Sequence, residues 1–227
     1  MSYHDATAPD PTASEGSVEL VIKPNAKDLG GFTVRRVLPS RDRQMVGPFI
    51  FFDHMGPATF PPGTGVNVRS HPHIGLATIT YLFDGEILHR DSLGYVQAIR
   101  PGAVNWMTAG AGVVHTERSH PDDRSIDRAM HGLQTWVALP HDRENGAASF
   151  EHTAADRMPD VDGIRVVAGT GWSMESPVVV SSPLVLAELR PTDARPIVID
   201  ATHPERGVLA VDGDVRLGAT RLRVGQL

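Results

Sequence analysis

The sequence predicts an all-β protein, and three observations lead to this fold class. Turn signals recur at short intervals along the chain, and short segments rich in Ile, Val, Thr, Tyr and Trp lie between them. No segment shows a long helical period. The length of 227 residues suits one large or two small domains. Many short, evenly spaced strands favour a barrel or a sandwich.

The expected strands and turns follow one another through the middle of the chain. The segments expected to be strands include residues 76–83, 95–99 and 133–139. The turns expected to separate such strands are Asp84-Gly85, Asp91-Ser92-Leu93-Gly94, Pro101-Gly102 and Gly110-Ala111-Gly112. Residues 1–17 are rich in Ala, Pro, Ser, Thr and Asp, so they cannot bury much surface and are expected to form a disordered tail.

An internal similarity indicates two barrels. The run Phe83-Asp84-Gly85-Glu86-Ile87 recurs as Val211-Asp212-Gly213-Asp214-Val215, each with an apolar segment before it and an Arg-x-Gly after it. We therefore expect an N-terminal barrel over residues 18–145 and a C-terminal barrel over residues 146–227.

Composition and charge exclude several classes of function. The chain has no cysteine, which excludes disulfides, thiolate nucleophiles, iron–sulfur clusters and zinc sites of the Cys type. The net charge of −6 argues against direct binding of nucleic acid, which needs a basic face. There is neither a secretory signal nor an apolar run long enough to span a membrane, so a cytoplasmic location is expected. A small group of arginines is interpreted as a solvated strand edge: Arg35, Arg36, Arg41 and Arg43.

Two short strings offer ligands for a metal ion, His71-Pro72-His73 and His115-Thr116-Glu117. In a strand, residues i and i+2 point the same way, so each string presents two ligand-type side chains on one face. Three imidazoles and one carboxylate are enough to hold a divalent transition metal and to leave a coordination position open. A single histidine is more often an ordinary surface or core residue, so the combination carries the signal.

The backbone around these strings carries further expectations. Pro72 cannot donate a ladder hydrogen bond, so its strand is expected at a barrel rim or a bulge. A tight turn at Gly110 and Gly112 would bring His115 and Glu117 inward at the start of their strand.

Longer strings around these motifs resemble the pirin family, which are bicupins. The matching strings are residues 46–57, 80–94, 106–117 and 131–137. Gly65, five residues and then His71-x-His73 is similar to the opening of the first cupin motif. Gly110-x-Gly112, two residues and then His115 resembles the second.

One departure from the general cupin pattern also fits this family. The glutamate that usually follows the second histidine of the first motif is absent, and Ala77 and Thr78 occupy its place. The carboxylate lies instead at Glu117, two residues after His115, which is a mark of pirin-like bicupins.

The resemblance implies two stacked cupin barrels of the jelly-roll type, with one metal in the N-terminal barrel. The metal ligands it implies are His71, His73, His115 and Glu117. Iron(II) is the expected metal, and nickel, cobalt, copper, manganese or zinc also fit the mixed nitrogen and oxygen ligands.

The C-terminal barrel is expected to differ from the first. Shifting the first Asp-Gly copy onto the second places Ile199 and Ala201 opposite His71 and His73, so this barrel is expected to carry no metal ligands. It is also expected to be incomplete, because the chain reaches its last residue before any equivalent of His115.

The resemblance implies two main roles. One is an iron-dependent dioxygenase that opens quercetin-like flavonols or another small aromatic or enolic substrate, with Glu117 as the catalytic proton acceptor. The alternative is an iron-dependent, redox-sensing regulator that binds a protein partner. A cupin that binds a small metabolite without turnover is a third interpretation. No direct contact with nucleic acid or with a membrane is expected.

Several residues near the motifs have two readings. The candidates for contact with the metal ligands are Asp53, His54, His89, Asp91 and Gln134, although turn hydrogen bonds would also explain the two aspartates. The aromatic candidates are expected to fill the core, with one or two lining a flavonoid-sized pocket: Phe51, Phe52, Trp106 and Trp136.

Overall fold

The computed structural model describes residues 18–29, 32–120 and 126–227, and within these residues it confirms the all-β fold class. The tail predicted for residues 1–17 lies outside the described residues. Apart from the short 3-10 turn η2 (Ala155–Arg157), the elements of the described part are strands. They are β1 (Asn25–Asp28), β2 (Thr33–Leu38), β3 (Phe49–Phe60), β4 (Asn67–His73), β5 (Leu76–Gly85), β6 (Ile87–Asp91), β7 (Val96–Ile99), β8 (Val104–Thr108), β9 (Val113–Arg118), β10 (Arg128–Ala138), β11 (Ser149–Thr153), β12 (Asp160–Val161), β13 (Ile164–Gly171), β14 (Met174–Glu175), β15 (Val185–Leu189), β16 (Val215–Leu217) and β17 (Thr220–Leu222). No helix in the described residues is long and apolar enough to cross a membrane.

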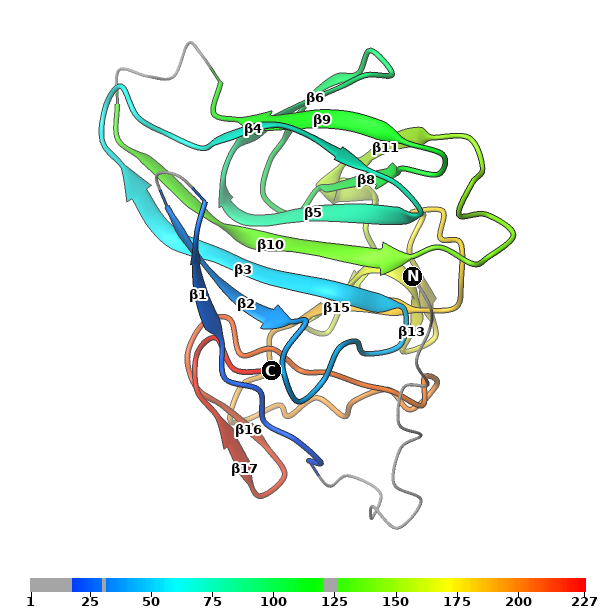
Figure 1. Cartoon of the computed structure of the whole chain (residues 1–227). Coiled ribbons are helices and arrows are strands. Elements are labelled where there is room, and N and C mark those ends of the chain that lie inside the picture. The colour runs from blue at the N-terminus through cyan, green and yellow to red at the C-terminus, as the bar shows by residue number, and fades with distance from the viewer. Residues whose placement is uncertain (1–17, 30–31, 121–125) are drawn as a thin grey trace.

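Two antiparallel sheets face each other and form the N-terminal barrel (Figure 1). The larger sheet has seven strands in the order β1-β2-β3-β10-β5-β8-β11, and the smaller has four in the order β4-β9-β6-β7. Strands β4, β9 and β6 form the upper layer of Figure 1, and β10 and β3 run beneath them. Two facing antiparallel sheets of this kind make a jelly-roll barrel.

The strands expected in the middle of the chain are confirmed, and so are three of the four turns, whereas Asp84-Gly85 forms the last two residues of β5 before the chain passes to β6. Residues 76–83 lie in β5, residues 133–138 in β10, and β7 begins one residue later than expected. The turn at Gly110 requires glycine, because its φ is +50° and an added Cβ would lie 2.2 Å from the carbonyl oxygen of Gly146. This turn connects β8 to β9 and so positions the strand that carries His115.

An apolar layer joins the outer face of the large sheet to the C-terminal half. Ile79 and Val137 of the barrel are fully buried against Val167, Ala168 and Leu184. Other apolar residues fill the space between the two sheets at one end of the barrel: Phe32, Val34, Met55, Phe60, Val66, Leu82, Ile87, Ile99, Ala103 and Met130. The large sheet is therefore packed on both faces.

Ile79→Ala is expected to lower the free energy of unfolding by about 2–5 kcal/mol, because it leaves a cavity in this apolar layer. Urea titration followed by tryptophan fluorescence would measure the loss. The matched control is Val198→Ala, which removes an apolar side chain that is 84% exposed and should change stability by less than about 0.5 kcal/mol. Equal losses for the two variants would contradict this assignment of the core.

The C-terminal half contains shorter strands. Strand β13 pairs with β12, β14 and β15, and β16 pairs with β17. The repeated Asp-Gly pair has a similar backbone in both copies, since φ is +87° at Gly85 and +78° at Gly213, but residues 206–211 before the second pair are not in a strand. The boundary at residues 145 and 146 stays a prediction; β11 lies beyond it and pairs with β8 of the barrel.

Candidate metal centre

The two histidine strings lie on neighbouring strands. His71 of β4 is paired in register with His115 of β9, and Pro72 with Val114. The expectation for Pro72 is confirmed, because β4 is the terminal strand of its sheet and its register shifts between Val68 and His71. A proline fits there since an edge strand can leave one N–H position unpaired.

The alternation of β9 directs two ligand candidates inward. His115 and Glu117 are buried, whereas Val114 is 42% exposed and Arg118 is also exposed. The period of two that was expected from the sequence is therefore confirmed for this strand. His115 and Glu117 both face the large sheet across the barrel.

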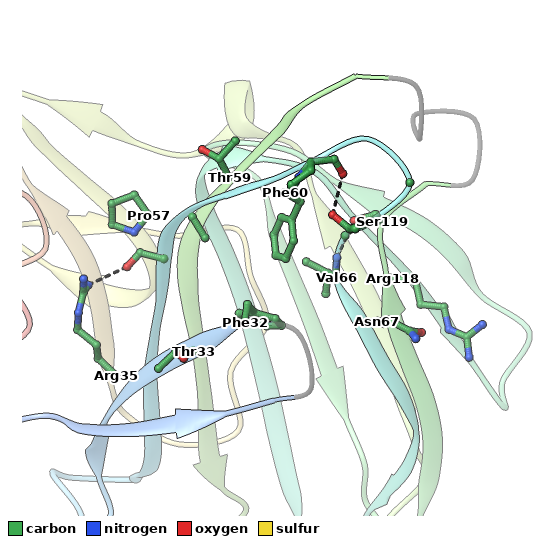
Figure 2. Close-up of a pocket in the computed structure, with 16 residues that line it drawn as sticks. Phe32, Thr33, Arg35, Pro57, Thr59, Phe60, Val66, Asn67, Arg118 and Ser119 are labelled. Carbon is green, nitrogen blue, oxygen red and sulfur yellow. Dashed lines mark hydrogen bonds between the residues drawn. The ribbon is translucent and has the colours of Figure 1, made fainter.

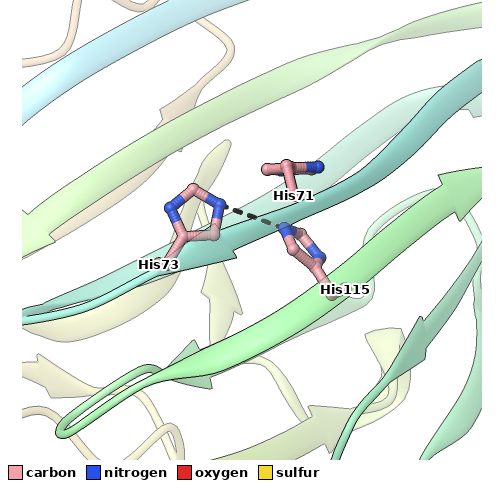
Figure 3. A group of neighbouring side chains, drawn as sticks. All are labelled: His71, His73 and His115. Carbon is pink, nitrogen blue, oxygen red and sulfur yellow. Dashed lines mark hydrogen bonds between the residues drawn. The ribbon is translucent and has the colours of Figure 1, made fainter.

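The structure brings the three expected histidines together, as Figure 3 shows. One ring nitrogen from each of His71, His73 and His115 lies within 4.8 Å of the others. The Nε2 atoms of His73 and His115 are 3.1 Å apart. Two ligands at right angles on a metal with bonds of about 2.1 Å would lie about 3.0 Å apart, so this spacing suits adjacent ligands.

Hydrogen bonds fix the tautomers of two of these rings. Nδ1 of His71 is 2.8 Å from the carbonyl oxygen of Arg69, so it carries the proton and leaves Nε2 with a free lone pair. His89 donates through Nε2 to the carboxylate of Asp91 at 2.9 Å, which leaves its Nδ1 as an acceptor. His115 then donates through Nδ1 to His89 at 3.3 Å, so its Nε2 lone pair faces the other two histidines.

Burial keeps the rings of His73 and His115 neutral. It lowers the pKa of His73 to about 4, with a smaller contribution from His71. It lowers the pKa of His115 to about 2, with further contributions from His71, His73 and His89. Neutral imidazoles are the forms that bind metal ions, so the protein holds the two rings ready for coordination at neutral pH.

Glu117 lies beside the three histidines and is not part of their group within 4.8 Å. It is paired in register with His89, and its Oε1 accepts a hydrogen bond of 3.2 Å from the hydroxyl of Thr80. Burial raises the pKa of this carboxyl group, while His89, His71 and the Thr80 hydrogen bond act in the opposite direction. As a metal ligand, Glu117 stays a prediction.

The residues present fit a divalent transition metal. Ring nitrogens of His71, His73 and His115 converge, and hydrogen bonds to neighbouring residues set the tautomers of His71 and His115. The buried carboxylate of Glu117 lies next to them. A cation there would relieve the burial cost of Glu117, and the mixed donors suit iron, nickel, cobalt, copper, manganese or zinc. The residues that would hold it are His71, His73 and His115, and the Glu117 carboxylate lies beside them.

His89→Phe is expected to weaken metal binding by about 10- to 100-fold, because His115 loses the acceptor that fixes its tautomer. Phenylalanine preserves the ring stacked on Phe150, whose centroid is 4.4 Å from that of His89. Competition titration with a chromogenic chelator would measure the affinity for Co(II). His141→Phe, at an exposed histidine, is the control, and equal affinity in both variants would contradict the role of His89.

Aromatic side chains line the large sheet beside the histidines. The ring of Trp136 meets the edge of His73 at a centroid distance of 5.0 Å and stacks on Phe51 at 4.0 Å. The guanidinium of Arg36 lies 4.3 Å above Phe51 and forms an ion pair with Asp53. Of the four aromatic candidates, Phe51 and Trp136 are therefore near the histidines.

The other two aromatic candidates fill apolar cores, Trp106 against the C-terminal half and Phe52 with Leu38 and Leu133. Gln134 makes no hydrogen bond to the histidines within the described residues; its Oε1 lies 2.9 Å from the hydroxyl of Thr80, which in turn lies 3.2 Å from Oε1 of Glu117.

His54 does not join the candidate centre. Its Nε2 lies 2.8 Å from Nε2 of His131, and its Nδ1 accepts from Arg35. Sequence reasoning missed this pair and also Thr80, because their partners lie far away in the chain. No motif spacing could have found them.

A separate groove of about 900 Å³ lies at the other end of β4 and β9, as Figure 2 shows. Its lining includes Phe32, Arg35, Phe60, Val66 and Arg118, and none of the three histidines. Apolar residues of the barrel interior, Phe32, Phe60 and Val66 among them, form part of its wall.

Comparison with known proteins decides the family. The pirin family model matches residues 31–137. A pirin-like protein of Caulobacter vibrioides is 42% identical over 217 residues, which cover 92% of this chain and 75% of that protein. The chain belongs to the pirin family. The family expected from the sequence is thereby confirmed.

Two further relatives carry the name of an enzyme. A Pseudomonas aeruginosa protein named "Putative quercetin 2,3-dioxygenase" is 41% identical to this pirin over 220 residues, covering 96% of this chain and 69% of that protein. A crystal structure of quercetin 2,3-dioxygenase from Acinetobacter baumannii matches with a TM-score of 0.67 and 43% identity. That match covers 73% of this chain and 55% of the crystallised one, so this chain spans about half of that protein.

Proposed function

We propose that this pirin is an iron-dependent dioxygenase that acts on quercetin-like flavonols. The observation that carries the proposal is the convergence of three imidazoles, two of them with pKa values lowered by burial, beside a buried carboxylate with a raised pKa. The similarity to proteins named as quercetin 2,3-dioxygenases supports it. The overall reaction would consume one dioxygen and release one carbon monoxide for each flavonol opened.

Iron(II), when bound, would supply Lewis acidity toward the adjacent hydroxyl and carbonyl oxygens of a flavonol and one-electron chemistry toward dioxygen. His71, His73 and His115 would hold the ion and leave a position open. Glu117 would accept the proton of the flavonol hydroxyl at its carboxylate, and the raised pKa brings this group closer to the pH at which it must take a proton.

The aromatic side chains beside the histidines would orient the substrate. Trp136 and Phe51 form a stacked pair next to His73, and flat aromatic rings pack well against such a surface. The surrounding β-sheets bury His115 and Glu117, which limits the access of water to the reacting atoms.

The test is dioxygen consumption by the iron(II)-loaded protein with quercetin. The expected result is uptake of dioxygen matched to loss of quercetin and release of carbon monoxide. The control is His71→Ala with its iron content measured. It should show no dioxygen uptake, no loss of quercetin and no release of carbon monoxide. No uptake by wild-type protein with iron demonstrably bound would reject the proposal.

The regulatory alternative would require a docking surface for a protein partner. The arginine cluster at residues 35–43 does not offer an open basic patch, because three of its members have partners within the chain. Arg35 donates to Gly56, Arg36 to Asp53 and Arg43 to Glu19. The alternative predicts that ferrous and ferric protein bind a partner with different affinity, and equal affinities would reject it.

A further inference from the structure

The two carboxylate oxygens of Asp91 have different partners. Oδ1 accepts hydrogen bonds from the backbone N–H groups of Leu93, at 2.9 Å, and Tyr95, at 3.1 Å, in the turn between β6 and β7. Oδ2 accepts a hydrogen bond of 2.9 Å from Nε2 of His89. The side chains of Asp91 and His89 are both buried. One oxygen therefore closes the turn, and the other faces the imidazole that supports His115.

These partners impose different requirements on the two oxygen positions. A backbone N–H can only donate, so the position of Oδ1 must be occupied by a hydrogen-bond acceptor. The position of Oδ2 faces a ring nitrogen, which in a neutral imidazole either donates or accepts. An acceptor at this position places the proton of His89 on Nε2, and a donor would place it on Nδ1. The chemistry of one atom of Asp91 thus selects the tautomer of His89.

The tautomer of His89 in turn selects that of His115, because their Nδ1 atoms are hydrogen-bonded at 3.3 Å. If His89 carries its proton on Nε2, His115 donates from Nδ1, and its Nε2 lone pair faces His73 (Figure 3). If His89 carries its proton on Nδ1, His115 must accept there and carries its own proton on Nε2. A ring nitrogen that carries a proton offers no lone pair to a metal ion.

We propose that Asp91 is a positioning residue of the metal centre, which through His89 holds His115 in the tautomer whose Nε2 lone pair can bind a metal ion. The inference rests on the metal centre of the proposed function and not on the choice of substrate. Asp91 acts only through the two imidazoles and touches neither metal nor substrate. The turn between β6 and β7 is therefore part of the support of the centre.

The first test measures the tautomers in the metal-free protein. Long-range proton–nitrogen NMR spectra of protein with isotope-labelled histidine distinguish rings protonated on Nδ1 from rings protonated on Nε2. In wild type, we expect the proton of His89 on Nε2 and that of His115 on Nδ1. Asp91→Asn should reverse both. Its amide oxygen must face the N–H groups of Leu93 and Tyr95, which places its NH₂ group against His89.

The affinity for Co(II) gives a second readout. Asp91→Asn is expected to bind Co(II) about 10- to 100-fold more weakly in competition with a chromogenic chelator, because the metal must displace the proton from Nε2 of His115. The matched control is Asp84→Asn, which should equal wild type. Asp84 also accepts a hydrogen bond from a backbone N–H, that of Gly85 at 2.8 Å, and takes no part in the hydrogen bonds of His89 and His115.

A double variant separates the effect on the tautomers from the loss of a negative charge. Asp91→Asn removes a charge as well as an acceptor, and charge alone would weaken the binding of a cation. In the His89→Phe background the connection to His115 is already broken, so adding Asp91→Asn should change Co(II) affinity by less than about 3-fold. A larger further loss would assign the effect to charge and overturn the inference.

The inference and the dioxygenase proposal can fail separately. Unchanged tautomers or unchanged Co(II) affinity in Asp91→Asn would overturn the role of Asp91 and leave the dioxygenase proposal to its own test. Absence of dioxygen uptake by iron-loaded wild type would reject the dioxygenase, while the NMR and Co(II) comparisons still decide the role of Asp91. If Asp91→Asn does not fold, the wild-type spectrum decides, since a proton on Nδ1 of His89 or on Nε2 of His115 would overturn the inference.

Discussion

His115→Ala is expected to abolish stoichiometric metal binding and, with it, dioxygen consumption with quercetin. The Nε2 atom of His115 is 3.1 Å from that of His73, and its ring is the one most constrained by hydrogen bonds to neighbouring residues. Loss of an outer partner of a ligand typically costs 10- to 100-fold in affinity, so loss of the ligand itself should cost more than about 100-fold. Metal analysis after gel filtration and oxygen-electrode traces would measure both effects.

Two controls make the result specific. His141→Ala removes an exposed histidine and should retain metal and turnover. Added imidazole should restore part of the metal content of His115→Ala, because the substitution leaves space for a free ring in a preformed pocket. Full metal occupancy in His115→Ala would remove this residue from the centre.

Glu117→Gln is expected to lower turnover by about 10²- to 10⁴-fold while the protein still binds metal through its histidines. The substitution preserves size and an oxygen that accepts from Thr80, and it removes the group that can take up a proton. Steady-state rates with quercetin, normalised to bound iron, would measure the effect.

The matched control is Glu188→Gln. This glutamate also accepts a hydrogen bond from a hydroxyl, at 2.6 Å from Tyr81, but it lies in the C-terminal half. Its substitution should leave metal content and turnover unchanged. A Glu117→Gln protein with full iron and the wild-type rate would show that another group accepts the proton.

The sequence predicts the fold and the three-histidine group well, because both depend on local periodicity. The alternation of β9 directs His115 and Glu117 to one face, and a proline between His71 and His73 indicates the edge position of their strand. These properties follow from two-residue spacing and from the missing N–H of Pro72, which need no knowledge of the rest of the chain.

The surroundings of the histidines could not be predicted in the same way. Thr80 reaches Glu117 from a strand 37 positions away in the chain, and the Trp136 ring meets His73 from another. Which of several nearby polar residues touches the centre depends on register between strands.

The place of Pro72 at the edge of the small sheet also affects how copies of this protein meet one another. An unpaired edge strand is a template for adding a strand from a second molecule, which leads to aggregation. Strand β4 is such an edge, and it holds two of the three histidines. Since Pro72 offers no N–H in the middle of these histidines, it interrupts the row of donors that an incoming strand would need. The residue that separates the two ligands therefore also protects this edge against self-association.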